Sequence, residues 1–206
     1  NFFTAAVDAT AFSVSGGPSS VRVGKTTNTG DVTLGSAITS VGAINVYGGS
    51  ITVNGGLTST ASSGTGILLK ASANISQTGA LTTSGANVVA WSDSDSASGG
   101  YISLGSGAST QTNGGKLVLA GGADDGSNGG TANDGIPDGY ARGVGAAGIS
   151  TTGSFTLNSG SGALLLRGSS NLKEGIVLAR QVIESGAAKN KLEQFVAFTQ
   201  KAGAAA

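Results

Sequence analysis

Two groups of oxygen-bearing side chains are the candidates for chemistry in this sequence. The first is Asp93 and Asp95, spaced D-x-D in the Ser-rich segment 92–100. Paired carboxylates share general acid and base work in polysaccharide hydrolysis. Such sites add basic residues and aromatic rings, and the aromatic residues nearby are Trp91, Tyr101 and Tyr140. A solvated loop is the simpler interpretation of this pair, so we assign no catalytic residue.

The second group lies in the segment 121–139. It contains Asp124, Asp125, Asn128, Asn133, Asp134 and Asp138. Hard cations such as Ca²⁺ take about six to eight oxygen ligands, but the EF-hand spacing and the Gly-Gly-x-Gly-x-Asp repeat are both missing. Asp and Asn also favour turns, because their side chains bond nearby backbone groups. We expect turn chemistry here and assign no metal ligand, which leaves calcium binding as an open alternative.

The composition excludes several other chemistries. The 206 residues include no His and no Cys, which removes the commonest general base, thiolate nucleophiles, disulfides and zinc–sulfur sites. Eleven basic residues balance eleven acidic ones, so there is no electrostatic footprint for nucleic acid. No apolar run reaches the length of a membrane span. We expect a protein that is no enzyme and has no cofactor.

The elements that position these groups are short strands. Apolar–polar alternation bounded by Gly, Ser or Asn predicts strands at 31–34, 43–46, 50–53, 66–70 and 87–91. Apolar residues recur every six to eight positions, at Val32, Ile38, Ile44, Ile51, Leu57, Ile67, Ile75, Leu81 and Val88. Three such steps make a repeat of roughly twenty residues, which indicates a solenoid.

Whole units also resemble one another. The segments 74–90, 101–119 and 148–166 each contain three apolar–polar strands in the same order. We therefore predict an all-β fold, a parallel β-helix with Val, Ile and Leu inside and Thr, Ser and Asn outside. The alternative is an antiparallel sandwich, which strand spacings of about eight to twelve residues favour. The segments 92–100 and 121–147 interrupt the pattern, and solenoid insertions map to loops on one face.

The repeat style resembles that of the filamentous-haemagglutinin-like and autotransporter-like adhesins of Gram-negative bacteria. The resemblance covers about 25–168 and is carried by GDVTL (30–34), GALTTSGANVVAWSDSD (79–95) and TNGGKLVLAGG (112–122). It implies a right-handed β-helical stalk, secreted to the bacterial cell surface, with no catalytic signature. The chain starts at Asn1 without Met or a basic leader, so we interpret it as processed or as part of a longer protein.

The C-terminal segment has a different composition. Eight of the 22 charges fall within 172–201, and helices are expected over 171–185 and about 188–201. The strings NLKEGIVLARQVIESGAA (171–188) and KLEQFVAFT (191–199) are similar to the extreme C-terminus of anthranilate phosphoribosyltransferase, where such helices are packing elements. That family's phosphoribosyl loop and acidic metal pair have no counterpart here. We predict two domains, a parallel β-helix at 1–169 and a short helical pair at 170–206 that serves as a tail or cap.

The sequence is compatible with three functions. The leading one is a structural or adhesive segment of a secreted bacterial surface protein, whose partner is a ligand on a host or neighbouring cell. The second is an extracellular filament subunit that self-associates through Thr and Ser ladders or open β-helix ends. The third is an enzyme, either polysaccharide-active or a phosphoribosyltransferase remnant. Regular Thr ranks also suggest ice binding, but the outer positions here mix Thr with Ser, Asn and Lys.

Overall fold

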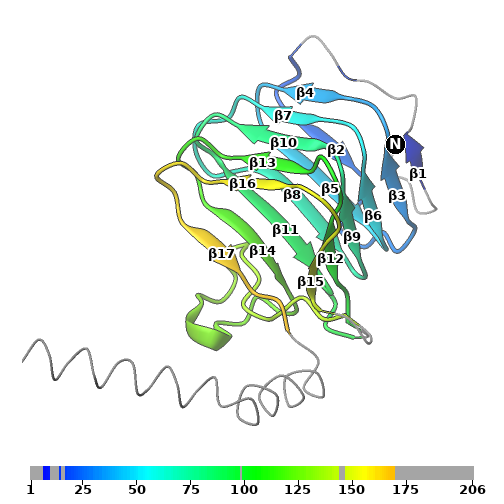
Figure 1. Ribbon diagram of the computed structural model, residues 1–206, viewed down its shortest axis with the longest axis vertical. Coiled ribbons are helices and arrows are strands. Elements are labelled where there is room, and N and C mark those ends of the chain that lie inside the picture. The colour runs from blue at the N-terminus through cyan, green and yellow to red at the C-terminus, as the bar shows by residue number, and fades with distance from the viewer. Residues whose placement is uncertain (1–6, 10–13, 15–16, 98, 144–146, 170–206) are drawn as a thin grey trace, which may run out of the picture. The chain divides into compact units, whose positions relative to one another are not determined.

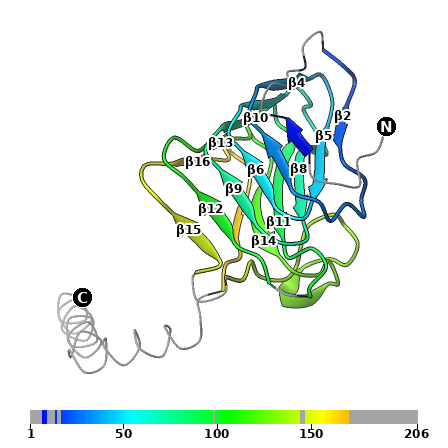
Figure 2. The ribbon, with the colours of Figure 1, turned by 90° about the vertical axis from the view of Figure 1, so that its right-hand side faces the viewer.

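The computed structural model describes residues 7–9, 14, 17–97, 99–143 and 147–169 of the chain. These residues form seventeen strands and one 3₁₀ helix, η1 (Ser127–Gly129), and contain no α-helix. The strands belong to three parallel sheets, whose stacked strands can be followed in Figures 1 and 2. The predicted β-helix is thus confirmed, and the antiparallel alternative is wrong for the described residues. The right-handed sense stays a prediction.

The three sheets follow one another along each coil. Sheet A contains β1 (Val7–Ala9), β3 (Val32–Leu34), β6 (Ile51–Val53), β9 (Ile75–Gln77), β12 (Ile102–Leu104) and β15 (Ile149–Thr151). Sheet B contains β4 (Ile38–Ser40), β7 (Leu57–Ser59), β10 (Ala80–Thr83), β13 (Ser109–Gln111) and β16 (Thr156–Asn158). Sheet C contains β2 (Val21–Val23), β5 (Ile44–Gly48), β8 (Thr65–Ala71), β11 (Asn87–Ser92), β14 (Leu117–Gly121) and β17 (Leu164–Leu166). We number the complete coils 1 to 5, beginning with β3–β5 and ending with β15–β17.

The register of the sheets confirms the predicted repeat. Val32 pairs with Ile51 in sheet A, and Ile38 pairs with Leu57 in sheet B. In sheet C, Val88 pairs with Ile67. Every predicted apolar anchor from Val32 to Val88 is at most 1% exposed. The period found in the sequence therefore arises because equivalent residues of successive coils stack on one another inside the solenoid.

One interior column is polar. At the end of each sheet B strand, a hydroxyl faces inward, and the column is Ser40, Ser59, Thr83, Thr112 and Ser159. Each hydroxyl donates to a backbone carbonyl, as Ser59 does to Gly42 and Thr112 does to Gly115. The chain turns from sheet B to sheet C at this point, which leaves carbonyls without a ladder partner. The hydroxyls satisfy these carbonyls, so polar residues are stable in the core.

The outer faces differ between sheets, which corrects one expectation. Sheets A and B carry Thr, Ser, Gln and Asn on their outer faces, as predicted. Sheet C instead carries an outer apolar cluster: Val89, Trp91, Val118 and Ala120 are buried, with Leu68, Ile136 and Leu165 packed against them. All five residues of β14 are buried, because the insertion that follows β14 covers this face. The helical pair predicted within 170–206 lies outside the described residues, and the two-domain division stays a prediction.

Candidate binding site at the looped corner

Both long insertions occur at the same corner of the solenoid, where the chain passes from sheet C to sheet A. In coils 1 and 2 this corner is short, spanning 49–50 and 72–74. In coils 3 and 4 it is extended to 93–101 and 122–148. We give the name looped corner to residues 93–97, 99–101 and 122–143 of these two extensions. The predicted gathering of insertions on one side is confirmed, and Figure 1 shows the second insertion, with η1, projecting beside β14.

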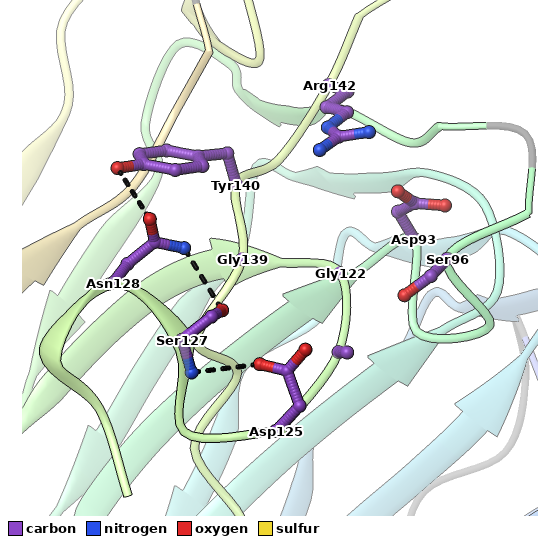
Figure 3. A pocket seen from close by; sticks show the side chains of 10 residues that line it. Asp93, Ser96, Gly122, Asp125, Ser127, Asn128, Gly139, Tyr140 and Arg142 are labelled. Atoms are coloured by element: carbon purple, nitrogen blue, oxygen red, sulfur yellow. Dashed lines mark hydrogen bonds between the residues drawn. The ribbon is translucent and has the colours of Figure 1, made fainter. Parts of the chain in front are cut away.

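The two insertions together line a cavity of about 340 Å³. Its polar and charged side chains, drawn in Figure 3, are Asp93, Ser96, Asp125, Ser127, Asn128, Tyr140 and Arg142. Asp93 and Ser96 come from the first insertion, and the other five come from the second. The sequence separation between the two groups explains why no single motif revealed this site.

The first insertion is held in a strained backbone conformation. Asp93 follows directly after β11 and has a φ of 49°, and Ser96 has a φ of 55°. Both values lie in the left-handed region, which non-glycine residues rarely adopt. The Asp93 carboxylate is buried and accepts a hydrogen bond from the Gly99 N–H at 3.0 Å. This bond closes the loop and fixes the carboxylate at the cavity wall.

The second insertion is held by its own carboxylates. Asp138 is buried, accepts from the Gly126 N–H at 2.7 Å and pairs with Arg167 at 3.4 Å. Asp124 accepts from the N–H groups of Asp134 and Gly135. These are the turn contacts expected from the sequence. No group of three acidic side chains converges on a possible metal position within the described ranges.

Tyr140 and Arg142 stand on a rigid segment. Ala141 between them is fully buried and joins the inner core. Its N–H donates to the Arg167 carbonyl at 2.8 Å, and its carbonyl accepts from the Ser169 N–H at 2.9 Å. Since the small central residue faces the core, its two large neighbours are directed outward. Tyr140 and Arg142 are both exposed and both line the cavity (Figure 3).

Asn128 and Asp125 complete the polar wall. The Asn128 amide donates to the Asp138 carbonyl at 2.8 Å and accepts from the Tyr140 hydroxyl at 3.5 Å. Hydrogen bonds from the Ser127 hydroxyl and N–H lower the pKa of the exposed Asp125 carboxyl below its usual value. Asp125 is therefore ionised over the physiological pH range, and it can accept hydrogen bonds from a ligand.

The predicted pair Asp93 and Asp95 is divided by the structure. Asp93 lines the cavity, but Asp95 does not, and its carboxylate accepts from the Ala97 N–H within the loop. Of the three neighbouring aromatic residues, Tyr140 alone is among the cavity residues. Trp91 is buried in the outer cluster, where its indole N–H donates to the Gly122 carbonyl at 2.7 Å. The two Asp residues therefore do not share one site.

The outer cluster of sheet C contacts the looped corner through Ile136 and through the bond from Trp91 to Gly122. The Lys70 ammonium lies over the Trp91 ring, 3.6 Å from its centroid. Burial lowers the pKa of Lys70, and the Asp124 carboxylate opposes part of this shift. The sequence did signal this second apolar layer, because Val88–Trp91 and Leu117–Ala120 are apolar runs instead of alternations. The predicted alternation with a single buried face is wrong for these two strands, which are buried on both faces.

The outer face of sheet B shows no regular Thr array. Its single file of outward residues is Thr39, Thr58, Thr82, Gln111 and Asn158, so the Thr rank ends after coil 3. In sheet A, Thr33 and Thr52 are followed by Ser residues. A flat ice-binding face needs regular ranks across all coils. The described coils therefore give this alternative no support.

The fold and the site together define a parallel β-helix with a polar cavity at one looped corner. No family model, no curated protein and no solved structure matches the chain. Within the part of the chain that the structure describes, no helix has the length and apolar character needed to cross a membrane.

Proposed function

We propose that this chain is a structural or adhesive segment of a secreted bacterial surface protein. It acts by presenting the looped corner on a rigid solenoid to a ligand on a host or neighbouring cell. The resemblance of its repeats to haemagglutinin-like and autotransporter-like adhesins supports this class and the extracellular location. No catalytic role is proposed.

One observation carries the proposal. Five coils stack in parallel in all three sheets, with one register shift between β8 and β11, while the long insertions gather at a single corner. A stack of this kind is stiff, because each strand is bonded to equivalent strands on both sides. Binding residues on loops are well positioned when a rigid scaffold holds the loop ends. The architecture therefore suits presentation of a surface.

Adhesion can be tested with beads that carry the full chain. Fluorescent beads coated with the chain are incubated with cultured epithelial cells and with Gram-negative bacterial cells. We expect them to be retained at least about tenfold more than albumin-coated beads, because many weak contacts add in avidity. The matched control carries the chain with 124–137 replaced by Asn-Gly. Retention equal to that of albumin beads on both cell types would overturn the proposal.

A second candidate is a self-assembling filament subunit, which the open end of coil 5 favours. Leu164 and Leu166 are 49% and 48% exposed, although Leu117 and Leu119, which precede them in register, are fully buried. Within the described ranges, β15–β17 pair on one side only. Unpaired strand edges with apolar side chains are templates for another chain.

The two candidates predict different behaviour in solution. A filament subunit sediments as growing assemblies when its concentration is raised and forms uniform fibres in electron micrographs. Leu164→Asp with Leu166→Asp abolishes these assemblies, because charges at the end of the stack oppose docking. The control pair, Thr39→Asp with Thr82→Asp, lies on the outer face of sheet B in two strands that are not neighbours, and leaves the assemblies intact. A chain that stays monomeric at high concentration rules out this candidate.

A further inference from the structure

We propose that the cavity at the looped corner is a binding site for a neutral saccharide. This inference rests on the adhesive function proposed above and names the chemical class of its ligand. The site brings together an aromatic ring, two carboxylates, an amide and a guanidinium from two insertions (Figure 3). Each of these groups has a specific role in holding a sugar ring.

The size and polarity of the cavity restrict the ligand. Its volume of about 340 Å³ lies at the small end of ligand pockets, which span about 300–1,000 Å³. The wall is built mostly from Asp, Ser, Asn, Tyr and Arg side chains and from glycine backbone. An apolar ligand would leave these polar groups unpaired, which is costly. A small ligand rich in hydroxyl groups satisfies them.

The Tyr140 ring supplies the apolar contact that a sugar needs. One face of a pyranose ring carries C–H groups, and these pack on aromatic rings, whose faces are electron-rich. Tyr140 is 39% exposed even though its hydroxyl bonds to Asn128. The hydroxyl contact orients the ring, and the exposure leaves the ring accessible. Tyr140 therefore provides a pre-positioned stacking surface.

The remaining side chains match hydroxyl groups, which both donate and accept hydrogen bonds. The exposed Asp125 carboxylate accepts from hydroxyls, the Arg142 guanidinium only donates, and the buried Asp93 carboxylate adds negative charge at the cavity wall. Arg142 is exposed and lines the cavity, so its guanidinium lies within reach of a ligand. Two carboxylates against one guanidinium disfavour an acidic ligand by repulsion. This balance favours a neutral saccharide.

The site is also pre-organised. Three of its residues, Asp93, Ser96 and Asn128, have φ between 49° and 55°. Non-glycine residues held in this region cluster at binding sites, where the surrounding structure maintains the strain. Such rigidity improves affinity, because little conformational freedom is lost when the ligand binds.

The test uses the full chain with free oligosaccharides. Cellohexaose, maltohexaose and chitohexaose are the neutral probes, and an alginate hexamer is the acidic probe. We expect saturation transfer in NMR to at least one neutral probe, and calorimetry then gives its affinity. Tyr140→Ala and Arg142→Ala each weaken that affinity about tenfold or more, as expected for central contacts. Arg142→Ala is informative even if Tyr140→Ala perturbs the loop, since the Arg142 side chain is exposed.

The matched control is Phe155→Ala, which removes another exposed aromatic ring, 41% exposed and outside the looped corner, and leaves the affinity unchanged. The inference is overturned if no neutral probe receives saturation at millimolar concentration, if the alginate hexamer binds more tightly, or if Tyr140→Ala and Arg142→Ala bind as the wild type does. The bead experiment separates this inference from the proposed function. Beads that adhere without any saccharide binding refute the saccharide and support the adhesive role. Saccharide binding without bead retention refutes the adhesive role.

Discussion

The outer faces of sheet B and sheet C are built on the same register but have opposite chemistry. In sheet B, Thr58 and Thr82 face solvent and stack on each other. In sheet C, the equivalent outward positions in coils 3 and 4 are Val89 and Val118, which are fully buried. The backbone ladder is parallel in both. The difference lies in what covers each face.

The cover of sheet C is the second insertion. Ile136 from this insertion packs against the outer cluster, and the pair of Asp138 with Arg167 ties it to the end of β17. Nearer to coil 1, the outward aromatic rings of sheet C are covered by cationic side chains. Lys70 lies over the Trp91 ring, and Arg22 lies over the Tyr47 ring. A long loop on a solenoid therefore creates a second small core outside the first. The strands beneath the loop therefore have apolar residues on both faces and show no apolar–polar alternation.

The largest expected effect comes from placing one charge on each face. Val118→Asp buries a carboxylate in the outer apolar cluster, where the nearby Arg167 guanidinium is already paired with Asp138. We expect a loss of about 3–5 kcal/mol in the free energy of unfolding. Thr82→Asp makes the same residue on the outer face of sheet B, where water solvates it. We expect a change within about 0.5 kcal/mol there. Urea unfolding of both variants gives these values, and equal losses would show that the two faces are equivalent.

The second largest loss of stability is expected from removing the insertion that covers the outer face of sheet C. The Ala123 carbonyl accepts from the Asp138 N–H at 2.8 Å, so the ends of the excursion 124–137 are adjacent. Replacing 124–137 by Asn-Gly suits a two-residue turn between these ends. Losing the cover over one Val or Ile side chain costs about 1.5–3 kcal/mol. The emission of Trp91, the single Trp in the chain, moves to longer wavelength as its surroundings become wetter.

A double-mutant cycle measures the coupling between Val118→Asp and the replacement of 124–137. In the chain with 124–137 replaced, Val118→Asp places its carboxylate near solvent. We expect its cost to fall by at least about 1 kcal/mol, within the usual range for groups in contact. An unchanged cost in both backgrounds contradicts the view that the insertion is what buries this face. Thr82→Asp, measured in both backgrounds, is the control and shows no coupling.

The solenoid itself was predictable from the sequence because its signal is repeated. Each coil supplies independent evidence of the same period, and pairs such as Val32 with Ile51 agree with the structure. The hydroxyl column was visible as well, in recurring Ser and Thr at the ends of sheet B strands. Its inward direction was not, because Ser and Thr are normally assigned to the solvated face.

The candidate site was predicted only in its parts. The sequence analysis considers Asp93 and Tyr140 together with Asp95 for acid–base chemistry, considers Asp125 and Asn128 for cation binding, and assigns none of them to a site. Arg142 was not considered, because an isolated basic residue has no local pattern around it. The complete site could not be predicted because its residues come from two insertions that are far apart in the sequence. These insertions lie side by side only because their coils are stacked on each other. The small Ala141 between the large Tyr140 and Arg142 is the one local signal that could have found both residues.

The smallest effect concerns Lys70, where the apolar part of sheet C meets its polar part. Burial lowers the pKa of Lys70 in the folded chain, so the unfolded chain binds more protons just below the ordinary Lys pKa of about 10.4. Stability contributed by this group therefore rises with pH through that window and is lower at neutral pH. Lys70→Met keeps the stem over Trp91 but removes the charge. We expect the advantage of the wild type over Lys70→Met to grow between about pH 8 and about pH 10 in urea unfolding. A difference that is constant or shrinks over this range would show that the Trp91 ring and Asp124 stabilise the ammonium more than burial penalises it.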